Sequence, residues 1–414
     1  MQVRLESARL KGEVGIIISK SYAHRALIMA ALADKPTRIK GKSAAKDVIA
    51  TIGCLEGLGA KIEETADGYV VRPIVNTGGG VLNAGESGST LRFIMPVAAA
   101  LGSTCEFVTE GRLGQRPMKE LTDTFKAHGV TVSDTAPYKL SGKLTSGKYT
   151  IRGDVSSQYI SGLLMALPLL EGDSEIIIEG EFVSKGYVDI TLDVMKQFAE
   201  KVAMTESGFL IKGGQKYQSP ETVAVEGDWS NAAFFLVAGA VNGDIVVRGL
   251  NLNSKQGDKR IYDILKEMGA DIRFENECVK VVKSDLKGIE IDAGDIPDLV
   301  PVLCVAAACA EGKTVIKNVE RLKLKESDRI QSTMSMLQSL GIQIEYSGSL
   351  IIEGGKIAGG KIDGCNDHRI VMAACVAASK AWGETVIDGA EAVQKSYPNF
   401  FTEYGNLGGK FYDV

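Results

Sequence analysis

The chain repeats one arrangement of hydrophobic and polar positions about every 70 residues. Each copy has an amphipathic helical segment that ends near a Gly and leads into a strand. A second strand of alternating polarity follows, such as GYVVRP at 68–73, GFLIKG at 208–213 and SLIIEG at 349–354. The copies lie at 52–65, 122–135, 195–208, 262–275, 334–347 and 400–413, and the helix stop falls at Gly59, Gly129, Lys201, Gly269, Gly341 and Gly405.

Another strand and helix precede this unit, as in CEFVTEG followed by RPMKELTDTFKAHG, so each copy predicts the order βαβαββ. One such unit cannot bury its helices and its sheet face alone, and the copies must pack together. With 414 residues, we expect an α/β (α+β) fold of two similar domains, each of three βαβαββ repeats. The same scaffold would suit a clamp or a binding protein, so the repeat alone does not indicate a function.

Composition narrows the function classes. The net charge is −5, and general nucleic-acid binding needs a basic surface, so any anion must be bound by a local cluster of Lys and Arg. The seven cysteines include no CxxC pair and there are only three histidines, a pattern that favours reduced thiols over disulfides or a metal site. No apolar run is long enough for a membrane span, and the first residues contain no secretory apolar segment.

Short polar motifs precede apolar helical runs in the first half of the chain. The residues of interest are Lys20, Ser21 and Arg25 in SKSYAHR, Gly85, Gly88 and Arg92 in NAGESGSTLR, Arg116 in GQRPM, Ser156, Ser157 and Gln158 in SSQYISG, and Ser184, Lys185 and Tyr187 in SKGY. Cations, hydroxyls and Gly at a helix N-terminus are typical of an anion site. Each motif alone is equally consistent with a helix cap or a tight turn.

The second half carries a different set of charged motifs. They comprise Asp298 in IPDLVPVL, Lys325, Glu326, Asp328 and Arg329 in KESDR, His368 and Arg369 in NDHR, and Lys395 in QKSYP. A charged run such as KESDR is usually a solvated helix face, and an Asp at a helix start is favoured by the helix dipole. Unlike the scaffold, these motifs are not repeated, which favours one shared site over a purely structural role.

The ordered series SKS…R, ESGSTLR, QRPM, SSQYISGLL, SKGY, VEGDWSNAAFFLVAGA, QGD, IPD, KESDR, NDHR and KSYP resembles the EPSP synthase (3-phosphoshikimate 1-carboxyvinyltransferase) family over essentially the whole chain. The resemblance implies an inverse α/β barrel in each domain and an active site in the inter-domain cleft. It also implies that the N-terminal strand belongs with the C-terminal domain. We therefore expect a repeat domain at 14–225 that binds mainly 3-phosphoshikimate, and a second at 1–13 plus 226–414 that carries the catalytic acid and base.

The resemblance implies transfer of the carboxyvinyl group of phosphoenolpyruvate to the 5-hydroxyl of 3-phosphoshikimate, with release of phosphate and without a metal or cofactor. Such a step belongs to the shikimate pathway to chorismate and aromatic amino acids. The implied catalytic residues are Asp298 as base, Glu326 as proton donor, Lys325 and Lys20. The implied 3-phosphoshikimate shell is Lys20, Ser21, Arg25, Ser156, Ser157, Gln158, Ser184, Tyr187, Asp298 and Lys325. The implied phosphoenolpyruvate shell is Lys20, Gly88, Arg116, Gln158, Arg329, Arg369 and Lys395.

Three alternatives share parts of this pattern. The UDP-N-acetylglucosamine enolpyruvyl transferases begin with a Lys-Asn pair and use a loop Cys, whereas here Ser21 follows Lys20 and Cys105 lies in a strand-like stretch. RNA 3′-phosphate cyclases need a nucleophilic His and a nucleotide site, and a non-catalytic repeat protein would lack the KESDR and DHR clusters. We expect a cytoplasmic monomer whose partners are the two small-molecule substrates, with neither nucleic acid nor a membrane among them.

Overall fold

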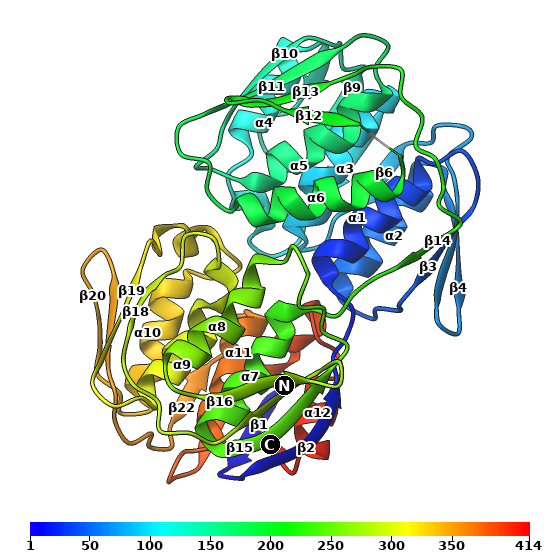
Figure 1. Ribbon diagram of the computed structural model, residues 1–414. Coiled ribbons are helices and arrows are strands. Elements are labelled where there is room, and N and C mark those ends of the chain that lie inside the picture. Colours follow the sequence, from blue (N-terminus) through cyan, green and yellow to red (C-terminus); the bar gives the residue numbers. More distant parts are fainter. Residues whose placement is uncertain (200) are drawn as a thin grey trace. The chain divides into compact units, whose positions relative to one another are not determined.

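The computed structural model describes residues 1–199 and 201–414, which divide into two compact units. The first unit is Ile18–Val225, and the second unit is Glu226–Val414 together with Met1–Ile17 (Figure 1). The chain enters the first unit four residues later than the sequence-based boundary, because strand β2 (Leu10–Gly15) pairs along its whole length with β15 (Gly243–Arg248) of the second unit.

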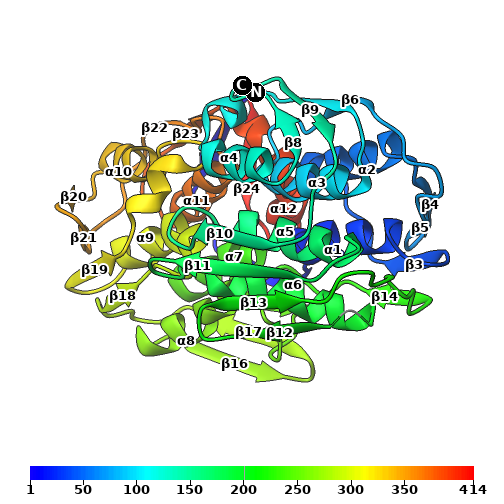
Figure 2. The ribbon, with the colours of Figure 1, turned by 90° about the horizontal axis from the view of Figure 1, so that it is seen from above.

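All the sheets in the described residues share one topology. Each has four strands: one edge strand pairs in parallel with its neighbour, and the two remaining pairings are antiparallel. A parallel pair needs a crossover connection, and an intervening helix supplies it where the two strands follow each other in the chain. The strand order predicted as βαβαββ is therefore present in each unit, as the sheet of β10, β11, β13 and β12 shows (Figure 2).

In the first unit the sheets are β14-β3-β5-β4, β6-β7-β9-β8 and β10-β11-β13-β12. Its helices are α1 (Lys20–Ala31), α2 (Lys46–Gly57), α3 (Gly88–Leu101), α4 (Lys119–Ala127), α5 (Ser157–Ala166) and α6 (Lys185–Gln197), with short 3-10 turns at Leu113–Gln115 and Leu167–Leu169. Its strands are β3 (Thr37–Lys40), β4 (Lys61–Thr65), β5 (Gly68–Arg72), β6 (Gly80–Asn83), β7 (Cys105–Val108), β8 (Val130–Val132), β9 (Tyr138–Gly142), β10 (Lys148–Arg152), β11 (Ser174–Glu179), β12 (Val202–Met204), β13 (Gly208–Ile211) and β14 (Thr222–Ala224).

In the second unit the sheets are β16-β17-β15-β2, β18-β19-β21-β20 and β22-β23-β1-β24. Its helices are α7 (Trp229–Asn242), α8 (Arg260–Glu267), α9 (Val300–Ala308), α10 (Arg329–Ser339), α11 (His368–Ala378) and α12 (Phe400–Asn406). Four 3-10 helices are η3 (Gly257–Lys259), η4 (Pro297–Leu299), η5 (Glu320–Leu324) and η6 (Ala390–Lys395). Its strands are β1 (Gln2–Glu6), β2, β15 (Gly243–Arg248), β16 (Asp271–Glu275), β17 (Cys278–Val282), β18 (Glu290–Asp292), β19 (Lys313–Lys317), β20 (Ile344–Tyr346), β21 (Leu350–Glu353), β22 (Lys361–Asp363), β23 (Thr385–Asp388) and β24 (Lys410–Asp413).

Strands from distant parts of the chain complete three of these sheets. Within the second unit, β1 lies between β23 and β24, and β2 pairs in parallel with β15. Within the first unit, β14 pairs in parallel with β3, so the last strand of that unit completes its first repeat. In each unit, strands from the two ends of its sequence therefore lie in the same sheet.

Two kinds of helix alternate along the chain. Helices α1, α3, α5, α7, α9 and α11 are buried almost all round and pack against one another within each unit. A helix that is apolar on every side needs complete cover, which the other helices and the sheets provide. The core therefore lies around these inner helices, and their first turns carry most of the motifs singled out in the sequence.

The helix stops agree with the repeat at four of six positions. Gly59, Gly129, Gly269 and Gly341 all have positive φ, which Gly adopts without steric cost. Two predicted stops were wrong. The left-handed residue after α6 is Ala199 instead of Lys201. Gly405 lies inside α12, and Gly408 with φ +90° follows the end of that helix.

Among the described residues no helix combines the length and the apolar character that a membrane crossing requires. All seven cysteines are free thiols, and five of them are buried.

The contact between α3 and α5 yields a stability prediction. A Cβ on Gly162 of α5 would collide with the backbone oxygen of Arg92 and lie 2.9 Å from Pro96 Cγ, both in α3. Gly162→Ala should therefore lower the free energy of unfolding by roughly 1–3 kcal/mol. Gly53→Ala is the matched control, because nothing lies within 4 Å of a Cβ at that position in α2. It should raise stability by roughly 0.5–1 kcal/mol. Equal thermal unfolding temperatures for both variants would contradict this description of the helix contact.

Candidate active site

Arg25 lies one turn into α1 of the first unit, and its side chain is only 1% exposed. Its hydrogen bonds run to Thr191 Oγ1, Ser21 O, Tyr187 O and Ser161 Oγ at 2.7, 2.7, 2.9 and 3.4 Å. All four acceptors are neutral, and burial lowers the pKa of Arg25 to about 9. A buried guanidinium held by neutral groups is costly, and a bound anion would offset that cost.

Lys20 is the first residue of α1, which Ser19 caps. Its ammonium group lies 2.7 Å from the carboxylate of Asp47, in the first turn of α2, and both side chains are largely buried. The sequence did not single out Asp47, because an acid in a first helical turn is ordinarily explained by the helix dipole. The pair fixes the direction of the Lys20 side chain.

Gly88 begins α3 and leaves space for two guanidinium groups. A Cβ at Gly88 would lie 3.0 Å from Arg116 NH1 and 3.4 Å from Arg92 NH1. Arg92 in turn donates to Gln158 Oε1 at 2.7 Å, and Gln158 Nε2 donates to Ser89 Oγ at 2.9 Å. The predicted residues Gly88, Arg116 and Gln158 are thus gathered where α3 and α5 begin.

The first turns of α1, α3, α5 and α6 contain no acidic residue. An acid there would normally be stabilising, and α2 and α4 each have one. Ser156 caps α5 by accepting from the Gln158 amide, Ser157 follows it, and Ser184 precedes α6 with φ 55°. All three serines are buried. The backbone N–H groups and hydroxyls at these helix starts are therefore suited to binding an anion.

In the second unit, three predicted cations converge on Asp298 in η4. Lys325 Nζ and Arg329 NH1 lie 3.2 and 2.7 Å from Asp298 Oδ1. Arg369 NH2 lies 3.0 Å from Oδ2, and Arg369 NH1 donates to the Asp298 backbone oxygen at 3.1 Å. Burial lowers the pKa of Lys325, against the opposing effect of the Asp298 charge. The three positive charges stabilise an ionised Asp298.

Arg329, at the start of α10, joins this carboxylate to two others. Its NH2 group lies 2.6 Å from Glu326 Oε2 and its Nε lies 2.7 Å from Asp367 Oδ2. Burial alone would lower the pKa of Arg329, but the charges of Asp367, Glu326 and Asp298 raise it well above its ordinary value. The sequence did not single out Asp367, which caps α11 in the NDHR motif and is fully buried.

Lys395 ends η6 and donates to the backbone oxygen of Asn366 at 2.6 Å, which places it beside the NDHR turn. His368 and Arg369 begin α11, and His368 Nδ1 lies 3.9 Å from Asp367 Oδ1.

The predicted residues therefore form two groups, one on each unit. The first unit holds Lys20, Ser21, Arg25, Gly88, Arg116, Ser156, Ser157, Gln158, Ser184 and Tyr187, and the second holds Asp298, Lys325, Glu326, Arg329, Arg369 and Lys395. Ser21 and Tyr187 contact Arg25 through their backbone oxygens.

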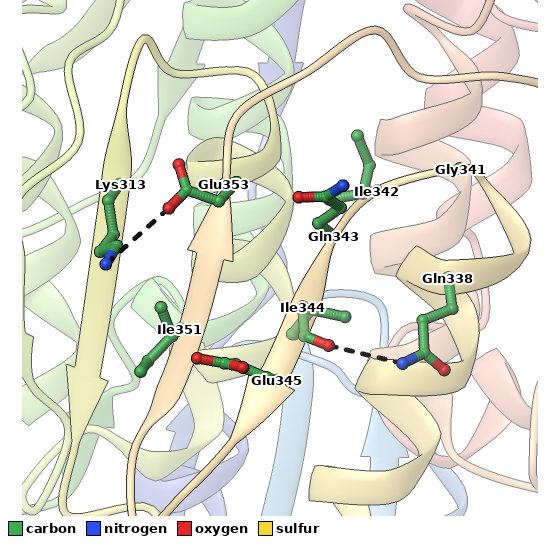
Figure 3. A pocket seen from close by; sticks show the side chains of 9 residues that line it. All are labelled: Lys313, Gln338, Gly341, Ile342, Gln343, Ile344, Glu345, Ile351 and Glu353. Carbon is green, nitrogen blue, oxygen red and sulfur yellow. Dashed lines mark hydrogen bonds and ion pairs between the residues drawn. The ribbon is translucent and has the colours of Figure 1, made fainter.

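Other features fall outside these groups. No cluster of three or more His, Cys, Asp or Glu suited to a metal ion occurs in the part of the chain that the structure describes. A surface hollow of about 700 Å³ lies over β19, β20 and β21 beside the end of α10 (Figure 3). It is lined by Ile342, Ile344 and Ile351 with Lys313 and Glu353, and by no predicted site residue.

Comparison with known proteins gives a consistent result. The family model described as EPSP synthase (3-phosphoshikimate 1-carboxyvinyltransferase) matches residues 5–404. The chain is 42% identical to the 3-phosphoshikimate 1-carboxyvinyltransferase of Clostridium kluyveri, over 99% of this chain and 97% of the relative. It is 41% identical to that of Methanocaldococcus jannaschii, over 97% of this chain and 96% of the relative.

Solved structures of enolpyruvyl transferases have the same fold. An EPSP synthase from Acinetobacter baumannii has a TM-score of 0.85 at 27% identity, with all of both chains covered. The enolpyruvyl transferase NikO from Streptomyces tendae shares the fold, with a TM-score of 0.80 at 17% identity over 100% of this chain and 98% of that one. With a family match over nearly its whole length and relatives at about 40% identity, this chain belongs to the EPSP synthase (3-phosphoshikimate 1-carboxyvinyltransferase) family.

Proposed function

We propose that Asp298, Glu326 and Lys325 carry the proton transfers by which this carboxyvinyltransferase joins phosphoenolpyruvate to the 5-hydroxyl of 3-phosphoshikimate. The products are 5-enolpyruvylshikimate 3-phosphate and phosphate, on the route to chorismate and the aromatic amino acids. Both substrates are anions, so cations must offset their repulsion as they approach each other. Arg suits bidentate contact with carboxylate or phosphate, and Lys supplies a compact charge.

The reaction proceeds by addition and then elimination. In the addition, Asp298 accepts the proton of the 5-hydroxyl, whose oxygen bonds to the central carbon of phosphoenolpyruvate. Glu326 donates a proton to the methylene carbon, which becomes a methyl group. In the elimination, the Glu326 carboxylate removes a methyl proton, the carbon–carbon double bond re-forms and phosphate departs. Asp298 returns its proton to the leaving phosphate, either directly or through Lys325, which gives up its own proton and takes that of Asp298, so the protons balance.

The observation that carries this proposal is the position of Arg329 between the proposed base and the proposed acid. One guanidinium binds Asp298 at 2.7 Å and Glu326 at 2.6 Å. Two carboxylates held by one planar group lie close enough to act on the 5-hydroxyl of one substrate and the methylene carbon of the other. Burial lowers the pKa of Lys325 and makes its ammonium group a readier proton donor.

For substrate binding, we assign 3-phosphoshikimate to the first unit, with Arg25 as its principal cation. Lys20, Ser21, Ser156, Ser157, Gln158, Ser184 and Tyr187 complete that shell, and Asp298 and Lys325 reach the 5-hydroxyl. Phosphoenolpyruvate is assigned to Lys20, Gly88, Arg116, Gln158, Arg329, Arg369 and Lys395. Support comes from the neutral surroundings of Arg25 and from the helix starts that contain no acid.

We also propose that a monomer in the cytoplasm is the active form. The seven thiols are free, as is usual in a reducing compartment. Sedimentation of the purified protein with both substrates tests the monomer: a stable dimer would contradict it.

Glu326→Gln tests the proposed proton donor. The amide keeps the shape of the side chain but cannot protonate the methylene carbon, so kcat should fall on the order of 100-fold or more. Phosphate release with both substrates present is the measurement. Glu320→Gln, an exposed position in η5, is the matched control and should retain wild-type turnover. Near-normal turnover of Glu326→Gln would refute this role.

Arg25→Gln tests the assignment of 3-phosphoshikimate to the first unit. Loss of a charge-assisted contact of roughly 2–3 kcal/mol should raise KM for 3-phosphoshikimate on the order of 100-fold and should affect KM for phosphoenolpyruvate much less. Steady-state kinetics with each substrate varied in turn provide the measurement. Arg38→Gln, which removes an exposed arginine paired with Asp67, is the control. An equal rise in both KM values would count against Arg25 as a site for one substrate.

A further inference from the structure

Asp258 is a buried acid that the mechanism above does not use. It lies in η3, in the QGD motif, and is 3% exposed. The hydroxyl of Ser230, on α7, is hydrogen-bonded to Asp258 Oδ2. The second carboxyl oxygen, Oδ1, is fully buried and accepts no hydrogen bond from the residues that the structure describes. An ionised carboxylate in such a position would be poorly stabilised.

The backbone holds Asp258 against the segment that presents Asp298. A Cβ on Gly257 would lie 3.0 Å from the backbone oxygen of Asp295, so the two loops are in close contact. The preceding residue, Gln256, donates to Gly227 O at 2.8 Å and accepts from the Trp229 amide at 3.0 Å. These bonds fix the loop to the start of α7.

Four groups on neighbouring elements determine the protonation of Asp258. Burial, the largest effect, raises its pKa to about 7, and the negative charges of Asp298 and Asp228 act in the same direction. The positive charge of Arg369 and the hydrogen bond with Ser230 oppose them. Asp258 therefore gains or loses a proton close to neutral pH, beside the proposed base and a proposed substrate cation.

We propose that Asp258 is a positioning residue that carries a proton in the substrate-free protein and thereby keeps the charge of Arg369 available to phosphoenolpyruvate. The proposal rests on the assignment of Arg369 to that substrate. With Asp258 neutral, Arg369 is paired with Asp298 and η3 adds no further negative charge to that pair. Loss of the Asp258 proton adds a negative charge, which attracts Arg369 and repels an incoming anion.

The proton has a consequence for stability that does not depend on activity. In the unfolded chain Asp258 ionises near its ordinary value of 3.8, whereas the folded protein keeps the proton up to about pH 7. Over that window the folded state binds more protons, so its stability relative to the unfolded state falls as pH rises. Asp258→Asn removes this dependence. Its Tm relative to wild type should therefore increase between pH 4 and pH 7 and level off above.

The kinetic test compares KM for phosphoenolpyruvate from pH 6 to pH 8.5 in wild type and Asp258→Asn. Ionisation of the substrate itself affects both proteins equally, so the difference between the two profiles isolates Asp258. If the bound anion shifts the Asp258 pKa by one unit, wild-type KM rises about tenfold more than that of the variant. Ser230→Ala removes a bond that lowers this pKa, and it should move the midpoint of the wild-type change to higher pH.

Different results would refute the role of Asp258 and the assignment of Arg369 to phosphoenolpyruvate. Identical pH profiles of Tm and KM in wild type and Asp258→Asn would overturn the proposal. A pH-dependent Tm difference without a KM difference would also overturn it, since the proton would then have no effect on Arg369. If Asp258→Asn does not fold, Ser230→Ala provides the test. A midpoint of the KM change at higher pH than in wild type supports the proposal, and an unchanged midpoint overturns it. Arg369→Gln with unchanged KM for phosphoenolpyruvate would instead refute the substrate assignment, while the Tm comparison would still report on the Asp258 proton.

Discussion

The positively charged side chain of Arg329 is almost completely buried, and ion pairs with three carboxylates stabilise it there. Asp367 caps α11, Asp298 lies in η4 and Glu326 lies three residues before the start of α10, so the same bonds that stabilise the charge also connect these elements. Removal of one partner from a buried pair of this kind typically costs about 3–5 kcal/mol. The second unit thus holds its proposed acid and base, both partly exposed, on a buried guanidinium.

In the first unit, the buried guanidinium of Arg25 lies among neutral groups instead of carboxylates. Arg25 is as buried as Arg329, but its hydrogen-bond acceptors are neutral, and the pKa values of the two groups shift in opposite directions. One unit holds a network of paired charges that we propose moves protons, and the other holds a positive charge whose cost an anionic substrate would offset. Such a division suits a reaction in which one anion must be held firmly while chemistry occurs on another.

Local patterns in the sequence predicted much of this structure. Hydrophobic periodicity gave the repeats, and polar residues before apolar runs marked helix starts such as Lys20, Ser157 and His368. These local patterns could not indicate Asp47, Asp367 or Asp258, because each acts through a partner far away in the chain. The sequence around each of them is that of an ordinary turn or helix cap. The stop at Gly408 was missed because Gly405 and Gly408 are both plausible by spacing, and only backbone conformation separates them.

Proton exchange at the methylene carbon tests the central claim most directly, because it isolates the step assigned to Glu326. In D₂O the methyl group of the addition intermediate contains one solvent-derived hydrogen, and elimination removes one of its three hydrogens. Product from the wild-type protein should therefore contain deuterium in its vinyl methylene group, as measured by NMR in a single turnover. Glu326→Gln should lose this incorporation, with Asp298 and Arg329 still present. Incorporation at the wild-type rate in Glu326→Gln would contradict the account.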